Sequence, residues 1–166
     1  MNMQELLDQL EKIPQYDIDE LKKLLLSHKQ VIIIGNGGSN AVAAHIAQDY
    51  TKQLGIKSFS FTDPSRLTCY INDYGMENAY SQFLKEFSDK ETLVILISSS
   101  GNSPNIIKCL EFCEINKLNF ILLTGFDKNN KANTLYGQKA KLNYWVNSKN
   151  YGVVECAHQC FLHTAS

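Results

Sequence analysis

Two glycine- and serine-rich loops carry the residues best suited to bind an anion. Gly35-Asn-Gly-Gly-Ser39 and Ser98-Ser-Ser-Gly-Asn-Ser103 each end an apolar run. Glycine lets the backbone approach a ligand closely. The helix expected after each loop offers free N–H groups and a positive dipole end. The second loop adds four hydroxyl groups, those of Ser98, Ser99, Ser100 and Ser103. The pattern predicts a phosphate site that needs no lysine or arginine, and the alternative is a pair of ordinary strand-to-helix turns.

Histidines and carboxylates at helical spacing form a second candidate centre. His45 and Asp49 are four residues apart and share one helix face. Glu155 and His163 are eight apart, about two turns, and also share a face. Two histidines and two carboxylates suit a tetrahedral zinc ion. The alternative is that both pairs lie on solvated helix surfaces. His158, three residues after Glu155, is expected to support the site or to pack.

The elements that must position these residues alternate along the chain. β-branched and apolar runs predict strands at 30–35, 57–61, 93–97 and 120–124, with a weaker one at 140–146. Helical periodicity predicts helices at 3–12, 18–28, 39–53, 75–87, 104–116 and 153–163, and a short one opened by Asp63 and Pro64. Ser103 is expected to cap a helix that begins at Pro104. Alternation of this kind predicts an α/β fold: a three-layer, doubly wound parallel sheet.

Composition narrows the function classes. The 166 residues fit one domain, 1–166, with an N-terminal helical segment (1–29) and an α/β core (30–166). A net charge of −1 argues against nucleic acid as a partner, and no apolar run approaches a membrane span.

GxGxxG and GxxxxGK[ST] are missing from the sequence, which disfavours dinucleotides and nucleoside triphosphates. Five cysteines without a CxxC motif, and a start without a signal-peptide pattern, indicate reduced thiols in a cytoplasmic protein. The pairs Cys109/Cys113 and Cys156/Cys160 are expected on apolar helix faces.

The motifs together resemble a known family. Gly35-Asn-Gly-Gly-Ser39 followed by His45, then Asn72-Asp-Tyr-Gly75, then Ile97-Ser-Ser-Ser-Gly-Asn-Ser-Pro-Asn-Ile106 is similar to sugar isomerase (SIS) domains. Within them the chain is most similar to phosphoheptose isomerases. The resemblance implies a flavodoxin-like five-stranded sheet and a homotetramer with shared active sites. It implies that the serine loop binds the sugar phosphate. It also implies substrate contacts at Asn36, Gly37, Gly38, Ser39, Asn72 and Asp73.

The resemblance also bears on the metal. Family positions with a histidine and a carboxylate four apart, and a glutamine and a histidine eight apart, fall on His45, Asp49, Glu155 and His163. Two of these depart from the family pattern, because Asp49 replaces the usual Glu and Glu155 replaces the usual Gln. All four side chains can still ligate a metal, so the resemblance implies zinc as the cofactor.

These expectations converge on a sugar-phosphate aldose–ketose isomerase. The resemblance implies conversion of sedoheptulose 7-phosphate to D-glycero-D-manno-heptose 7-phosphate for a lipopolysaccharide, capsule or other surface glycan. Asp49 or Glu155 is the expected base, and His163 the expected acid. The alternatives are a non-catalytic SIS protein, such as a regulator of replication initiation, and an isomerase of a hexulose or arabinose phosphate. A sugar-phosphate sensor is a further alternative.

Overall fold

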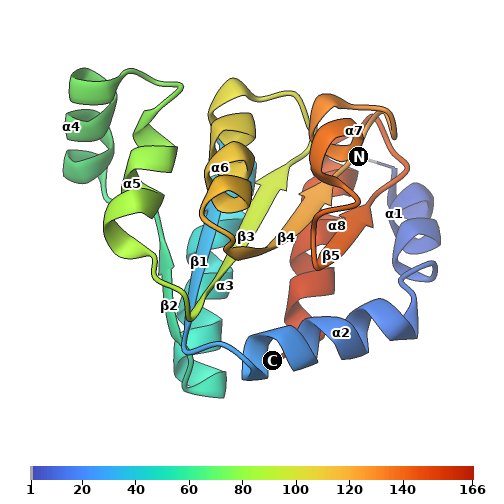
Figure 1. Ribbon diagram of the computed structural model, residues 1–166. Helices are drawn as coiled ribbons and strands as arrows, with labels where there is room; N and C mark the ends of the chain where they lie inside the picture. The colour runs from blue at the N-terminus through green and yellow to red at the C-terminus, as the bar shows by residue number, and fades with distance from the viewer. Residues whose placement is uncertain (1) are drawn as a thin grey trace.

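A single parallel sheet organises the molecule. The computed structural model describes residues 2–166. The strands are β1 (Gln30–Gly35), β2 (Lys57–Ser60), β3 (Thr92–Ser98), β4 (Asn119–Thr124) and β5 (Leu142–Trp145). All pairings are parallel, in the order β2-β1-β3-β4-β5 (Figure 1). The predicted fold class is thus confirmed, and β1 and β3 flank the point where the strand order reverses.

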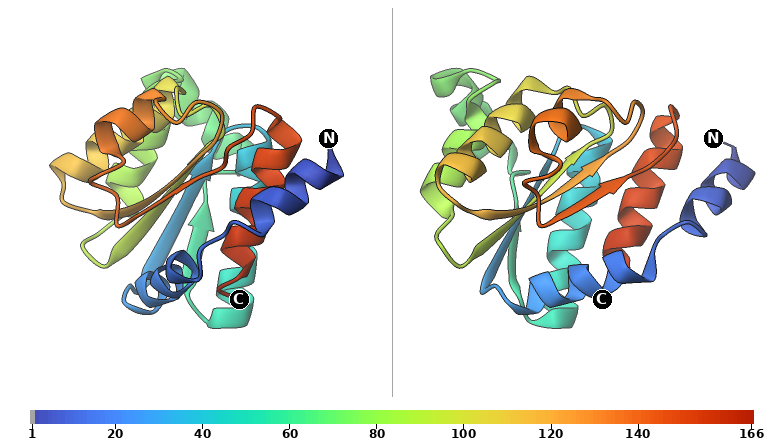
Figure 2. Two further views of the ribbon diagram at one scale, coloured as in Figure 1. Left: turned by 90° about the vertical axis from the view of Figure 1, so that its right-hand side faces the viewer. Right: turned by 45° about the vertical axis from the view of Figure 1, so that its right-hand side comes forward.

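Helices cover both faces of the sheet. They are α1 (Met3–Leu10), α2 (Gln15–Leu26), α3 (Gly38–Leu54), α4 (Pro64–Tyr74), α5 (Ala79–Phe87), α6 (Pro104–Ile115), α7 (Lys131–Tyr136) and α8 (Tyr151–His163). Alternate side chains of a strand point to opposite faces. Val31 and Ile33 therefore belong to the core cluster shared with α1, α2, α3 and α8, whereas Ile32 and Ile34 belong to the cluster shared with α5, α6 and α7. Figure 2 shows these two groups of helices on opposite sides of the sheet. Because both faces are covered, the central strands β1 and β3 are wholly buried.

Several helix starts follow the signals in the sequence. Asp63 caps α4, where its Oδ1 accepts a hydrogen bond from the Arg66 N–H at 2.8 Å. Pro104 is the first residue of α6, with Ser103 at the cap position. The Ser103 side chain makes no bond to the helix. Its hydroxyl lies instead 3.4 Å from that of Ser98, inside the serine loop.

The structure differs from the predicted elements in three places. The helix predicted over 75–87 begins only at Ala79, because Gly75 ends α4 with a φ of 76°. Helix α7 was not predicted, since six residues are too few to show a helical period. Strand β5 has four residues rather than seven.

The cysteines and helices bear on the expected compartment. All five cysteines are free thiols. Cys109 and Cys113 lie in the apolar core, as predicted, but Cys160 is exposed, so the prediction of an apolar face is wrong for that residue. Among the described residues, no helix is both long and apolar enough to cross a bilayer.

Candidate active site

A small pocket lies where β1 and β3 end. Its volume is about 110 Å³, and both loops contribute to it, together with the start of α8. The lining residues are Asn36, Ser39, Ile97, Ser98, Ser99, Ser100, Ser103, Tyr151 and Glu155. Ligands of doubly wound sheets bind at this topological position. The structure therefore brings together the two loops that the sequence singles out.

The serine hydroxyls in this pocket are available to a ligand. Ser99 is buried, and its Oγ has no hydrogen-bond partner within residues 2–166. A buried hydroxyl without a partner in the protein is costly, so this donor is suited to bind an acceptor atom of a ligand. The described lining contains no lysine or arginine. An anion here would depend on hydroxyls and backbone N–H groups at the starts of α3 and α6.

Glycines allow the first loop to reach the pocket. Gly37 has a φ of 54°, a conformation that glycine adopts without strain. A Cβ added to Gly35 would lie 2.7 Å from the backbone of Ser39. The tight turn from β1 into α3 thus depends on these two glycines.

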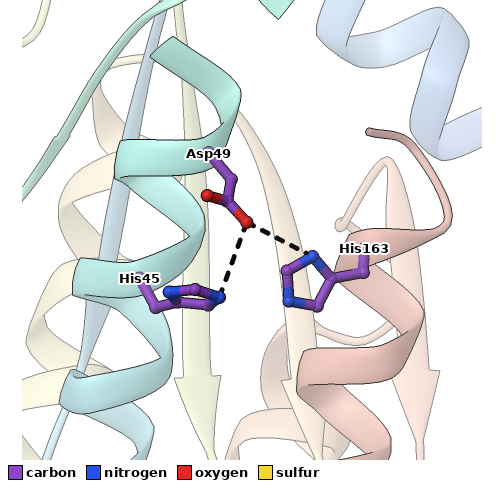
Figure 3. A group of neighbouring side chains, drawn as sticks. All are labelled: His45, Asp49 and His163. Atoms are coloured by element: carbon purple, nitrogen blue, oxygen red, sulfur yellow. Dashed lines mark ion pairs between the residues drawn. The ribbon is translucent and has the colours of Figure 1, made fainter. Parts of the chain in front are cut away.

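A second group of polar side chains lies between α3 and α8. Asp49 Oδ2 is 3.5 Å from His45 Nε2 and 3.5 Å from His163 Nδ1 (Figure 3). The side chain of Asp49 is 16% exposed, against 51% for His45 and 34% for His163. The carboxylate is therefore the inner member of the trio, and the two imidazoles stand nearer to solvent.

The donor set of this trio fits a zinc ion. Two imidazole nitrogens and one carboxylate oxygen are ligands that zinc takes. Ligand atoms about 2.1 Å from a tetrahedral zinc lie roughly 3.4 Å apart, and the two measured separations of 3.5 Å match that geometry. All three ligand atoms lie within 4.8 Å of one another. Three protein ligands with one open position are the arrangement of catalytic zinc sites.

Glu155 does not join this trio. It precedes His163 on α8 by eight residues, roughly 12 Å along the axis. Its carboxylate lies against Gly38 at the start of α3, where a Cβ on that glycine would collide with it. Burial raises the pKa of Glu155. The four predicted metal ligands are thus divided, and Glu155 lies in the serine-loop pocket.

Comparisons with known proteins agree with this architecture. No protein-family model matches the chain. The phosphoheptose isomerase GmhA of Neisseria gonorrhoeae superposes with a TM-score of 0.86 at 26% identity, over 96% of this chain and 89% of that one. The sugar isomerase domain of the RpiR transcription factor from Sphaerobacter thermophilus gives 0.67 at 17% identity, covering 98% and 84%. The chain folds as a sugar isomerase (SIS) domain.

Sequence similarity points to one group of SIS proteins. The chain is 36% identical over 122 residues to the phosphoheptose isomerase of Fusobacterium nucleatum. That match covers 70% of this chain and 61% of the relative, so the chain spans less than two thirds of the curated relative's length. The predicted resemblance to phosphoheptose isomerases is confirmed at this level.

Two predicted substrate contacts of this SIS domain lie outside the pocket. Asn72 and Asp73 occupy the last turn of α4 and are exposed. The Asn72 amide donates to Asp73 Oδ1 at 3.0 Å, and the pocket lining includes neither residue. Helix α4 has no fully buried residue within the described chain. In this chain, Asn72 and Asp73 are therefore not part of the pocket that the serine loop lines.

The structure adds Tyr151, which lines the pocket, and Asn105 to the predicted site residues. Asn105, at the second position of α6, is buried and pairs with Asn36 through two amide hydrogen bonds of 2.9 and 2.8 Å. This pair ties the first loop to the helix that follows the serine loop. Asn105 belongs to the motif at residues 97–106 that carries the family resemblance, but nothing in that motif indicated its pairing with Asn36.

Proposed function

We propose that this chain is a sugar-phosphate aldose–ketose isomerase acting on sedoheptulose 7-phosphate. The observation that supports this most directly is an anion pocket and a zinc-type trio beside the same two helices. From Ser39, which lines the pocket, to His45 of the trio, α3 advances six residues, roughly 9 Å. An extended seven-carbon sugar phosphate has a comparable length. With the phosphate at the serine loop, its carbonyl end reaches the trio.

The proposed role of the pocket is to anchor the substrate. Ser98, Ser99, Ser100 and Ser103 would donate hydrogen bonds to the phosphate oxygens. Asn36, Gly37, Gly38 and Ser39 would line the first turn of the chain that leads away from it. Binding energy gained at the remote phosphate orients the reacting carbons. This accounts for a phosphate pocket that lies apart from the groups that move protons.

The trio is proposed to carry out the proton transfers. Isomerisation of the ketose removes a proton from C1 and returns one at C2, while the C1 hydroxyl proton moves to the C2 oxygen. Asp49 turns Oδ2 toward both imidazoles, so Oδ1 is the oxygen left to act as the base. His163 turns Nδ1 toward Asp49, which leaves Nε2 to donate a proton as the acid.

His45, Asp49 and His163 would hold the zinc ion. When bound, zinc polarises a carbonyl or hydroxyl oxygen as a Lewis acid. Asp49 can then serve as ligand and base only through different oxygens. Glu155, which lies roughly 12 Å from His163 along α8, is assigned to the phosphate end of the substrate rather than to the role of base.

The assignment of Glu155 makes a pH-dependent prediction. Its ionised carboxylate repels a phosphate in the same pocket, and burial raises its pKa. Substrate affinity should therefore increase as the pH falls through that pKa, because the carboxyl becomes neutral. Glu155→Gln, which is neutral at every pH, should lower KM about tenfold at neutral pH, equivalent to roughly 1.4 kcal/mol.

The measurement for Glu155 is KM against pH for both proteins. Ionisation of the substrate phosphate affects both equally, so their ratio isolates Glu155. Glu91→Gln is the control, since Glu91 pairs with Lys29 away from the pocket. If the KM values of the two proteins are equal at every pH, Glu155 does not lie beside the substrate phosphate.

The proposal extends to the oligomeric state, the fate of the product and the location of the protein. A homotetramer with shared active sites would allow the exposed Asn72 and Asp73 of one subunit to contact substrate bound by another. The absence of a fully buried residue on α4, within the part of the chain described, supports this. The product, D-glycero-D-manno-heptose 7-phosphate, would supply a lipopolysaccharide, capsule or other surface glycan. Free thiols throughout support a cytoplasmic location.

Elemental analysis of the purified protein, together with an isomerase assay on sedoheptulose 7-phosphate, tests this function. We expect about one zinc per chain and turnover that a chelator abolishes and zinc restores. Zinc without turnover would indicate another sugar phosphate as the substrate. A protein with neither would be a non-catalytic SIS module.

A further inference from the structure

His158 is a wholly buried histidine that the proposed mechanism does not use. It lies on α8 between Glu155 and His163. Its Nε2 is 3.0 Å from the main-chain oxygen of Thr124, the last residue of β4. A carbonyl can only accept a hydrogen bond, so Nε2 carries the proton. Burial lowers the pKa of His158 to about 4, which keeps the ring neutral at physiological pH.

The carbonyl that His158 binds belongs to the peptide that holds the serine loop. The N–H of that same peptide, on Gly125, donates to the main-chain oxygen of Ser99 at 3.0 Å. The Thr124 oxygen also accepts from the Val146 N–H at 2.9 Å, beyond β5. One peptide plane is thus bonded to α8 and to the segment after β5 through its oxygen, and to the serine loop through its nitrogen.

Packing around Gly125 keeps this peptide close to its neighbours. A Cβ on Gly125 would lie 2.7 Å from Val154 Cγ1 on α8 and 3.2 Å from the Ser99 oxygen. The Thr124–Gly125 peptide is therefore packed directly against both α8 and the serine loop. A rotation of the peptide would move the Ser99 backbone, and with it the adjacent hydroxyl in the pocket.

Burying the His158 imidazole between α8 and β4 costs more free energy than burying an apolar side chain there. Its Nδ1 is buried and has no hydrogen-bond partner among residues 2–166. An apolar side chain would avoid that cost. Unlike an apolar side chain, the imidazole donates one hydrogen bond to the Thr124 oxygen. We therefore expect the role of His158 to depend on that bond.

We propose that His158 is a positioning residue for the serine loop, acting through the Thr124–Gly125 peptide. The proposal rests on the proposed function in so far as that loop binds the substrate phosphate. His158 touches no substrate, so its loss should weaken phosphate binding while leaving the proton transfers at the trio nearly unchanged.

The test compares His158→Met, which removes the donor, with His158→Gln, whose amide nitrogen reaches about as far as Nε2. We expect the Met variant to bind inorganic phosphate and sugar phosphate about three- to tenfold more weakly, with kcat little changed. The Gln variant should regain most of the affinity. If the Met variant does not fold, His158→Asn, whose amide stops short of Thr124, takes its place.

Two further readouts separate positioning from general damage to the core. Phe161→Leu alters a buried side chain one turn away that stacks on Tyr144; it should lower stability without changing phosphate affinity. Hydrogen exchange at the Gly125 amide should accelerate in the Met variant and not in the Gln variant. That readout remains informative even if the wild-type protein binds no phosphate, in which case the proposed function fails separately. Unchanged exchange at Gly125 in the Met variant would overturn the proposal, as would equal phosphate affinity in the Met and Gln variants.

Discussion

Replacement of Asp49 by Asn should lower kcat by about 10²- to 10⁴-fold, the range for loss of a general acid or base. Asn keeps the shape of the side chain but removes the negative charge that lies 3.5 Å from both His45 and His163. It also removes the oxygen assigned as the base. Zinc content should fall together with turnover, because an amide oxygen is a poorer ligand for zinc. A steady-state assay and elemental analysis of the same preparation check both effects.

Two variants sharpen this result. Asp19→Asn is the control for a lost carboxylate, since Asp19 is exposed on α2 and only accepts a bond from Gln15; it should retain zinc and turnover. Asp49→Glu restores the residue usual in phosphoheptose isomerases and should keep the metal. Full turnover in Asp49→Asn would remove Asp49 from the mechanism.

The sequence predicted the fold well where a residue's neighbours along the chain determine its structure. Runs such as Val31-Ile-Ile-Ile34 form strands because their branched side chains suit a sheet buried on both faces. Pro104 begins a helix because its fixed φ is already helical. Helix α7 was not predicted because its segment has no apolar periodicity. Its start is marked only by Asn130, whose side chain accepts a hydrogen bond from the Asn133 N–H.

The candidate site was predicted less completely, because spacing on one helix does not fix distances between helices. His45 and Asp49 are one turn apart on α3, and the prediction that they share a face held. Glu155 and His163 also share a face, but two turns separate them, and α8 packs along α3 so that only His163 reaches Asp49. The Asn36–Asn105 pair joins residues 69 positions apart, which no local pattern reveals.

A stabilising variant with weaker binding is expected at Ser99. Its hydroxyl is buried without a partner in the described chain, so Ser99→Ala removes an unsatisfied group and breaks no internal bond of that hydroxyl. The free energy of unfolding should rise by about 1 kcal/mol, or roughly 2–4 °C in Tm for a chain of this size. If the hydroxyl donates to a phosphate, KM should rise about 10- to 100-fold, the value of a hydrogen bond to a charged group.

Ser88 provides the matched control, because its replacement should lower Tm without affecting KM. Its hydroxyl donates to the Leu84 carbonyl at 2.6 Å, away from the pocket, so Ser88→Ala should lower Tm and leave KM unchanged. Thermal melts and substrate titrations of the two variants therefore separate a serine retained for binding from one retained for folding. A lower Tm with unchanged KM in Ser99→Ala would mean that Ser99 serves the fold. A higher Tm with weaker binding would mean that the chain gives up stability at this position to hold an anion.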